Sequence, residues 1–314
     1  MSYKIYEEEV RKLNKILFSE EDISLKEKYL IEIIKKFDLK QRLLFRICYN
    51  KIFPQNNLIT DLSSKLSGQF SNLVMNLFMT RIDLECIEIK RILEGVNLNK
   101  NNILESITVN PFWLNQKIAK RFSELFNKEL KNEIIKNNLF NDFTKNILIN
   151  CLNTKRNDND KKLDTDEIEE KVKLVLNTNP DELIKNNEIF INIFGIPSAK
   201  ELILISRKFK EKKGEHFLTY LENKLKEEEF FAIKEVIYNI CHPSENFAIK
   251  LKNCIKGVEI NVENINRILV LRNEVDIQEI KKIYDKIYEK DFSDEIPNIF
   301  NDSYKELVLY LYNK

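Results

Sequence analysis

The chain has 314 residues, a length that allows one large domain or several small repeats. Its 51 Lys and Arg residues balance 50 Asp and Glu residues, and the net charge of +1 argues against a nucleic-acid-binding protein, whose basic excess would be clear. With 43% hydrophobic and 32% charged residues the composition is that of a soluble globular protein, and only 5 Gly and 6 Pro argue against loop-rich β folds and glycine-dependent α/β folds. These numbers predict an all-α chain.

The N-terminal stretch MSYKIYEEEV is acidic and lacks the basic and apolar blocks of a signal peptide. No apolar run approaches the ~18 residues of a membrane span. The cysteines are odd in number and widely spaced, which predicts reduced, buried thiols rather than a disulfide framework. They are Cys48, Cys86, Cys151, Cys241 and Cys254. A cytoplasmic protein is therefore expected.

Apolar residues recur three and four apart along nearly the whole chain, and the prolines fall between these periodic stretches, as at helix starts. Two kinds of stretch repeat. One pairs CIEIKRILEGVNLNKNNILESI from Cys86 with FAIKLKNCIKGVEINVENINRIL from Phe247. The other unites LSGQFSNLVMNLF, FNDFTKNILINCL and FNDSYKELVLYLY, in which Phe70, Phe143 and Tyr304 occupy equivalent places.

The spacing of these stretches predicts four helical units of roughly 70 residues. Thr154 to Asp166, TKRNDNDKKLDTD, contains a single apolar residue and is predicted to be a solvated, charged linker. The expected boundaries are 1–82, 83–153, the linker 154–166, 167–242 and 243–314.

These residues resemble the annexin family. KGVEINVENINRILVLRNEVDIQEIKKIY, from Lys256, resembles the pattern Lys-Gly-x-Gly-Thr, an apolar helix, Arg-Ser-Glu-x-Asp-Leu and a final Ile-x-x-x-(Phe/Tyr) helix. The residues in register are Lys256, Gly257, Arg272, Glu274, Asp276, Ile280 and Tyr284. Leu66, Ser67, Gly68 and Phe70 resemble the Leu-Ser-Gly-x-Phe signature. The resemblance runs from about Glu7 to Tyr312 and implies four repeats of about five helices each, arranged as a curved disc.

The resemblance also implies a calcium-dependent function. Annexins bind calcium through the carbonyls of a Gly-x-Gly turn and a carboxylate about 40 residues later, and the ion bridges protein and anionic phospholipid. This chain departs from that pattern in each unit. Its turns are Ser19 to Ser24, Gly95-Val96-Asn97, Ile184 to Asn187 and Gly257-Val258-Glu259-Ile260, and its carboxylate places carry Lys65, Asn138, Lys224 and Ile299. We therefore expect no calcium or other metal cofactor of the family type, although Glu20, Glu21 and Asp22, or Glu227 to Glu229, stay open as a weak cation site.

Two functions follow as hypotheses. The first is a calcium-independent, membrane-associated scaffold, in which Lys65 and Lys224, helped by Lys100 and Lys185, contact phospholipid phosphates. The alternative is a structural or protein-interaction module, with self-association or docking to a complex and no lipid binding. The expected partners are thus an anionic phospholipid surface or a protein, and no nucleic acid.

Other candidate residues are interpreted as structural. Arg272, Glu274 and Asp276 are expected to form a buried polar network that fixes the geometry between helices. Trp113, in NPFWLN, is expected to be a core anchor at a helix start, although a membrane-inserting loop aromatic stays open. The two histidines, His216 and His242, form no catalytic or zinc motif, and no P-loop is present, so no enzyme is expected.

Overall fold

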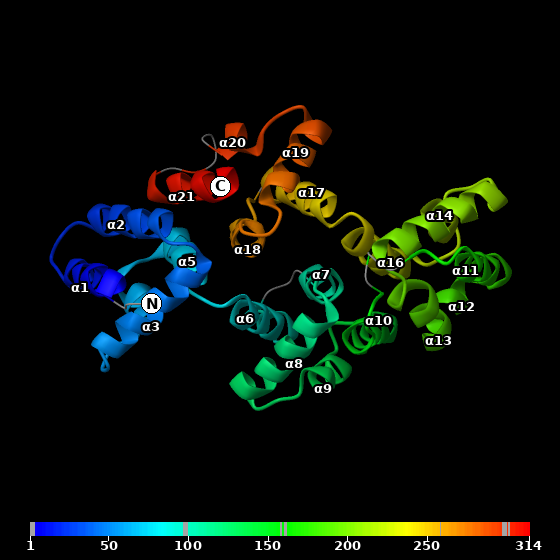
Figure 1. Cartoon of the computed structure of the whole chain (residues 1–314), viewed down its shortest axis with the longest axis horizontal. Helices are drawn as coiled ribbons and strands as arrows, with labels where there is room; N and C mark the ends of the chain where they lie inside the picture. The colour runs from blue at the N-terminus through cyan, green and yellow to red at the C-terminus, as the bar shows by residue number, and fades with distance from the viewer. Residues whose placement is uncertain are drawn as a thin grey trace. The chain divides into compact units, whose positions relative to one another are not determined.

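The computed structural model of the chain describes residues 4–96, 100–157, 159, 162–257, 259–296, 300 and 302–314. Within these residues every regular element is a helix, as Figure 1 shows. The all-α fold class is confirmed.

The contacts between helices divide the chain into two compact units. Unit 1 comprises Met1–Arg81 and Ser244–Lys314, and unit 2 comprises Ile82–Pro243. The boundaries of four repeats stay a prediction, because the contacts separate two units and not four.

Unit 1 combines the first and last helices of the chain. Within it α1 packs on α3, α5 on α18 and α2 on α21. Its helices are α1 (Lys4–Leu17), α2 (Ile23–Lys36), α3 (Leu39–Ile52), α4 (Leu58–Lys65), α5 (Gly68–Leu77), α17 (Pro243–Lys256), α18 (Val262–Arg272), α19 (Ile277–Tyr288), α20 (Phe292–Glu295) and α21 (Asp302–Asn313).

Unit 2 is formed by the middle of the chain. Here α7 packs on α16 and α11 on α14 (Figure 1). Its helices are α6 (Arg81–Leu93), α7 (Asn101–Val109), α8 (Phe112–Phe126), α9 (Leu130–Lys136), α10 (Asp142–Asn153), α11 (Thr165–Asn177), α12 (Pro180–Lys185), α13 (Asn187–Phe190), the π-helix η1 (Ile191–Gly195), α14 (Ala199–Lys213), α15 (Phe217–Glu222) and α16 (Glu227–Cys241).

Local sequence explains where these helices begin and which face they bury. Asp38 and Gln41 form a capping box at α3, so two backbone N–H groups that lack partners inside the helix are satisfied. Asn141 caps α10 by accepting a hydrogen bond from the Thr144 N–H. Along α1 the buried residues are spaced three and four apart, which gives one apolar stripe facing the core.

The equivalent aromatic residues of the repeated stretches are all core residues. Phe70 in α5, Phe143 in α10 and Tyr304 in α21 are each at most 8% exposed. Gly68 opens α5 with φ +69, in the left-handed region, and this explains why glycine stands before Phe70. The repeated pattern thus marks helices that bury an aromatic side chain near their first turn.

The structure corrects the interpretation of Trp113. This residue lies in the first turn of α8 and is 59% exposed, whereas Leu114, Ile118 and Phe122 are buried. The buried positions are four residues apart, so the helical period directs their neighbour Trp113 outward. The core-anchor prediction is wrong because Leu114 holds the inward position.

The segment predicted as a solvated linker also differs from expectation at its start. Asn157 donates its backbone N–H to the Ile196 carbonyl at 2.7 Å, and its side-chain amide donates to Glu201 at 3.0 Å. Arg156 donates to two backbone carbonyls of the same region. Charged sequence alone did not distinguish these bound residues from the exposed ones that follow, Lys162 to Asp164.

Among the described helices, no single one is long and apolar enough to cross a membrane. One bent pair, Asn187–Gly195 with Ala199–Lys213 at 104°, meets the length and composition criteria jointly. The large apolar residues Phe190, Phe194 and Phe209 of this pair are core residues, at most 1% exposed.

The five cysteines are free thiols, and four of them are buried. Burial raises the pKa of Cys86 and Cys241 to about 12 and that of Cys151 to about 11. Because the thiolate is the reactive form, these thiols stay protonated at mildly alkaline pH. We expect the native chain to react only slowly with Ellman's reagent at such a pH, and all five thiols to react at once in concentrated guanidinium chloride. Rapid reaction of Cys86 in the native chain would contradict this assignment.

Candidate membrane-binding loops

In unit 1 the turn between α1 and α2 meets the end of α4. Lys65, the last residue of α4, places its Nζ 4.8 Å from the centre of the Phe18 ring. The ammonium lies over the aromatic face, a favourable cation–π arrangement. Residues 47 positions apart in the sequence thus form one surface feature.

This feature, which we call the unit 1 tip, is amphipathic. Phe18 is 47% exposed, and Ile23 and Leu25 at the start of α2 are exposed to a similar degree, 44% and 47%. The turn itself carries the exposed carboxylates of Glu21 and Asp22, and Asp22 caps α2 by accepting from the Ser24 N–H. Apolar side chains, one lysine and acidic groups therefore share the tip.

A lysine side chain also binds a backbone carbonyl of this turn. The Nζ of Lys26 donates to the Ser19 carbonyl at 3.0 Å. A turn carbonyl of this kind is a ligand that calcium would use. In the unit 1 tip an ammonium group of the chain holds that oxygen.

In unit 2 the connection from α6 to α7 meets the connection from α9 to α10. The side-chain amide of Asn137 donates to the Leu93 carbonyl at 2.7 Å and joins the two connections. Gly95 lies in this turn with φ +73, and Asn138 is exposed. A side-chain amide thus links these two connections.

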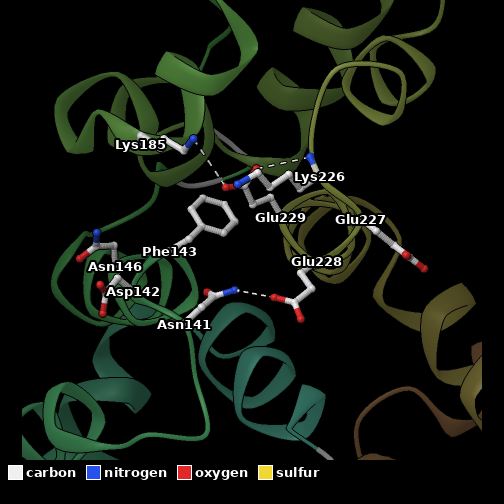
Figure 2. A pocket seen from close by; sticks show the side chains of 9 residues that line it. All are labelled: Asn141, Asp142, Phe143, Asn146, Lys185, Lys226, Glu227, Glu228 and Glu229. Atoms are coloured by element: carbon white, nitrogen blue, oxygen red, sulfur yellow. Dashed lines mark hydrogen bonds and ion pairs between the residues drawn. The ribbon is translucent and has the colours of Figure 1, made fainter.

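A second place in unit 2 is a pocket of about 590 Å³ where the start of α10 faces the start of α16. Figure 2 shows the Phe143 ring between the Lys185–Glu229 ion pair and the Asn141–Glu228 hydrogen bond. Lys226 also lines the pocket, while the Glu227 side chain points away from these two interactions. The pocket thus holds charges of both signs.

Lys185 is bound by carboxylates in this pocket. Its Nζ lies 3.0 Å from Asp181 Oδ2 and 3.7 Å from Glu229 Oε1. The hydrogen bond to Asp181 raises the pKa of Lys185, so the side chain is a permanent cation at neutral pH. Lys185 therefore neutralises the two carboxylates and is less available to an external phosphate than a lysine without a carboxylate partner would be.

A neighbouring pocket of about 470 Å³ shares Asn141, Glu227 and Glu228 with the first. Lys100, at the start of α7, lines it together with Phe231, which is 45% exposed. Lys100 and Lys185 therefore approach the start of α16 from two adjoining pockets.

The four predicted lysines thus divide into one in unit 1 and three in unit 2. Lys224 lies in the turn before α16, is exposed and lines neither pocket. Sequence reasoning missed Phe18, Lys226 and Phe231. The sequence could have indicated Phe18, because it is a large apolar residue directly before the acidic turn. Lys226 and Phe231 lie at the start of α16, whose position beside these pockets depends on the fold.

The residues Arg272, Glu274 and Asp276 are held by two separate sets of contacts in unit 1. The Arg272 guanidinium forms a paired hydrogen bond with the Asp276 carboxylate, with Nε to Oδ1 at 2.7 Å, and lies over the Phe247 ring. Glu274 Oε1 instead accepts from the Leu39 N–H at 3.0 Å and from Lys314 Nζ at 3.0 Å. Arg42 reaches the same Glu274 oxygen at 3.5 Å. Glu274 thus joins α3 to Lys314, which follows α21.

In the described part of the chain, no group of three His, Cys, Asp or Glu residues is arranged to hold a metal ion. Three positions that bear on the calcium prediction, Asn97, Val258 and Ile299, lie outside the described residues.

The described chain is thus an all-helical protein in which segments between distant helices contact one another. The family model described as Annexin matches residues 246–311, from α17 to α21. Mouse annexin A6 is 24% identical over 283 residues, which are 90% of this chain and 41% of that protein, so the chain spans about two fifths of its length. Drosophila melanogaster annexin B10 is 20% identical and covers 84% of this chain and 81% of its own length.

The fold of the chain is also similar to that of solved annexins. The solved structure of annexin III superposes with a TM-score of 0.88 and 19% identity, covering all of this chain and 94% of that one. The match to the family model over 246–311, the annexin relatives along most of the chain and the fold shared with annexin III all support an annexin-family protein.

Proposed function

We propose that this annexin-family chain is a peripheral membrane-binding scaffold of the cytoplasm that binds anionic phospholipid without calcium. Family membership supports the membrane-binding role. The unit 1 tip is the observation that carries the proposal. Its exposed Phe18, Ile23 and Leu25 offer apolar surface to a bilayer interface, and Lys65 adds a cation at the same point.

The calcium-free part of the proposal rests on what holds the turns. The Lys26 ammonium donates a hydrogen bond to the Ser19 carbonyl. The Lys185 ammonium forms ion pairs with Asp181 and Glu229. A divalent ion would have to displace a lysine at either place before it gained these oxygens. The acidic residues Glu21 and Asp22 oppose an anionic membrane, so the apolar side chains of the tip must contribute as well.

The proposal is tested by sedimenting the chain with vesicles in the presence of a chelator. We expect binding to vesicles that contain phosphatidylserine and weaker binding to pure phosphatidylcholine, with the difference falling as salt rises. Phe18→Ser should weaken binding about tenfold, equivalent to about 1.4 kcal/mol of lost apolar burial.

Ile47→Ser is the matched control, since Ile47 is 54% exposed on α3 and lies outside these turns. It should bind as the unchanged chain does. No sedimentation with any vesicle would instead favour the structural or protein-interaction module.

A further inference from the structure

A cavity of about 690 Å³ lies in unit 2, apart from the turns described above. It is formed where the end of α7 and the start of α8 face the residues after α10 and the end of α16. Its volume is within the range of small-molecule binding sites. None of its lining residues lines either pocket beside α16.

The lining of this cavity is electropositive. Of the described residues that form it, none is an aspartate or a glutamate, although the chain has 50 of these residues. Two cations, Lys155 and Arg156, line it instead. The rest of its polar lining is mainly amide, from Asn110, Asn115, Asn157, Asn159 and Asn239. The side-chain amides of Asn110, Asn115, Asn157 and Asn239 already donate to protein oxygens, so Lys155 and Arg156 are the groups offered to an anion.

Among the residues that the structure describes, Arg156 has no acidic partner. Its Nη1 donates to the carbonyls of Phe194 at 2.8 Å and Pro197 at 2.7 Å, and no carboxylate of the described residues lies within ion-pair distance. Burial lowers the pKa of Arg156, and the thiols of Cys151 and Cys241 oppose this effect. A guanidinium has five N–H donors, so Nε and Nη2 are left to bind another group.

The Glu201 carboxylate, which binds the residue next to Arg156, already accepts hydrogen bonds from the protein. Glu201 accepts from the Asn157 amide at 3.0 Å and from the Ser198 N–H at 2.6 Å. It does not line the cavity. A partly buried cation such as Arg156 is unfavourable without a nearby anion. Binding of an anion in the cavity would therefore be favourable.

Part of the cavity lining is apolar. Trp113 lines it while 59% exposed, which places the indole where the cavity meets solvent. Ile107, Ile240 and Pro243 add apolar surface. A guest that fills the cavity therefore needs an apolar part as well as a charged head.

We propose that this cavity binds a small amphipathic anion, an organic carboxylate or phosphate whose head hydrogen-bonds to Arg156 and Lys155 while its apolar part lies against Trp113. The described residues that line the cavity include none of the residues of the unit 1 tip.

The test uses the full chain and the fluorescence of its single tryptophan, with calorimetric titration as a second readout. The probes are octanoate and octyl phosphate below their micelle concentrations, with octanol and octyltrimethylammonium as neutral and cationic controls. We expect saturable binding of both anions, at least about tenfold tighter than octanol, as for a charge-assisted hydrogen bond. Arg156→Gln should remove this tenfold advantage and leave octanol binding unchanged.

Lys117→Gln is the matched control, because its ammonium lies over the Trp113 ring at 5.0 Å but does not line the cavity. It should keep the preference for anions. If Arg156→Gln fails to fold, Ala199→Leu fills part of the cavity without removing a side-chain hydrogen bond and should weaken all probes that bind there.

Equal affinity for octanoate and octanol, absence of heat and fluorescence change with every probe, or full octanoate affinity in a folded Arg156→Gln chain would overturn the proposal. Vesicle binding separates the possible sources of the anion. If Arg156→Gln binds vesicles normally, the guest is a free anion; if it loses vesicle binding together with octyl phosphate, the guest is a phospholipid head group.

Discussion

Replacing Lys65, Lys100 and Lys224 by glutamine together is expected to weaken binding to phosphatidylserine vesicles about 100-fold. Lys100 and Lys224 are exposed, and Lys65 stands at the edge of the unit 1 tip. Each lysine near an anionic surface contributes about 1 kcal/mol, so three contribute about 3 kcal/mol, or roughly two factors of ten. Lys185 is left unchanged in this variant, because Asp181 and Glu229 already bind its ammonium.

A second triple variant controls for net charge. Lys40, Lys120 and Lys210 are exposed lysines of α3, α8 and α14 that belong neither to the unit 1 tip nor to the two pockets at the start of α16. Their replacement by glutamine removes the same total charge and should lower vesicle affinity only a few-fold. Equal losses in the two variants would show that binding follows net charge rather than the lysines of the turns, and the lysine-to-phosphate assignment would then fail.

Arg42→Met is expected to destabilise the chain by about 3 kcal/mol, a drop of roughly 6 to 12 °C in Tm for a unit of this size. Arg42 is only 2% exposed in unit 1, although arginine is seldom buried. Its Nε donates to the Leu77 carbonyl at 2.9 Å and its Nη1 to the Phe37 carbonyl at 2.7 Å. Methionine fills similar space but leaves both buried carbonyls without a donor.

The measurement is a thermal melt followed by circular dichroism, at equal protein concentration. Arg11→Met is the control, since Arg11 and its partner Glu7 are both exposed on α1 and such pairs contribute little. That variant should melt within about 2 °C of the unchanged chain. A similarly small shift for Arg42→Met would mean that the two carbonyls find other donors and that Arg42 does not hold α3 in place.

Local sequence was sufficient for the fold because the signals were periodic. Aromatic residues at equivalent places, Phe70, Phe143 and Tyr304, all mark buried helix positions, and Gly68 stands where the backbone enters the left-handed region. The same periodicity, applied residue by residue, would have turned Trp113 outward. That error came from treating its size as a sign of burial when Leu114 already filled the inward place.

The candidate site was less predictable, because its pairings join distant segments. The contact of Lys185 with Asp181 follows from helical spacing within α12, but its contact with Glu229 depends on how α16 packs. The same holds for Lys65 over Phe18. The charged run that contains Arg156 looked like solvated linker, and only the carbonyls of Phe194 and Pro197 reveal that its first residues are bound.

The most direct test of calcium-free membrane binding is co-sedimentation of the chain with phosphatidylserine vesicles in chelator and again in millimolar calcium. Lysine ammonium groups already bind the oxygens of Ser19, Asp181 and Glu229. We therefore predict equal vesicle binding in both conditions, and a similar loss of binding in each as the salt concentration is raised. Binding that appears only with calcium would contradict the account and would direct attention to the carboxylates of Glu20, Glu21 and Asp22.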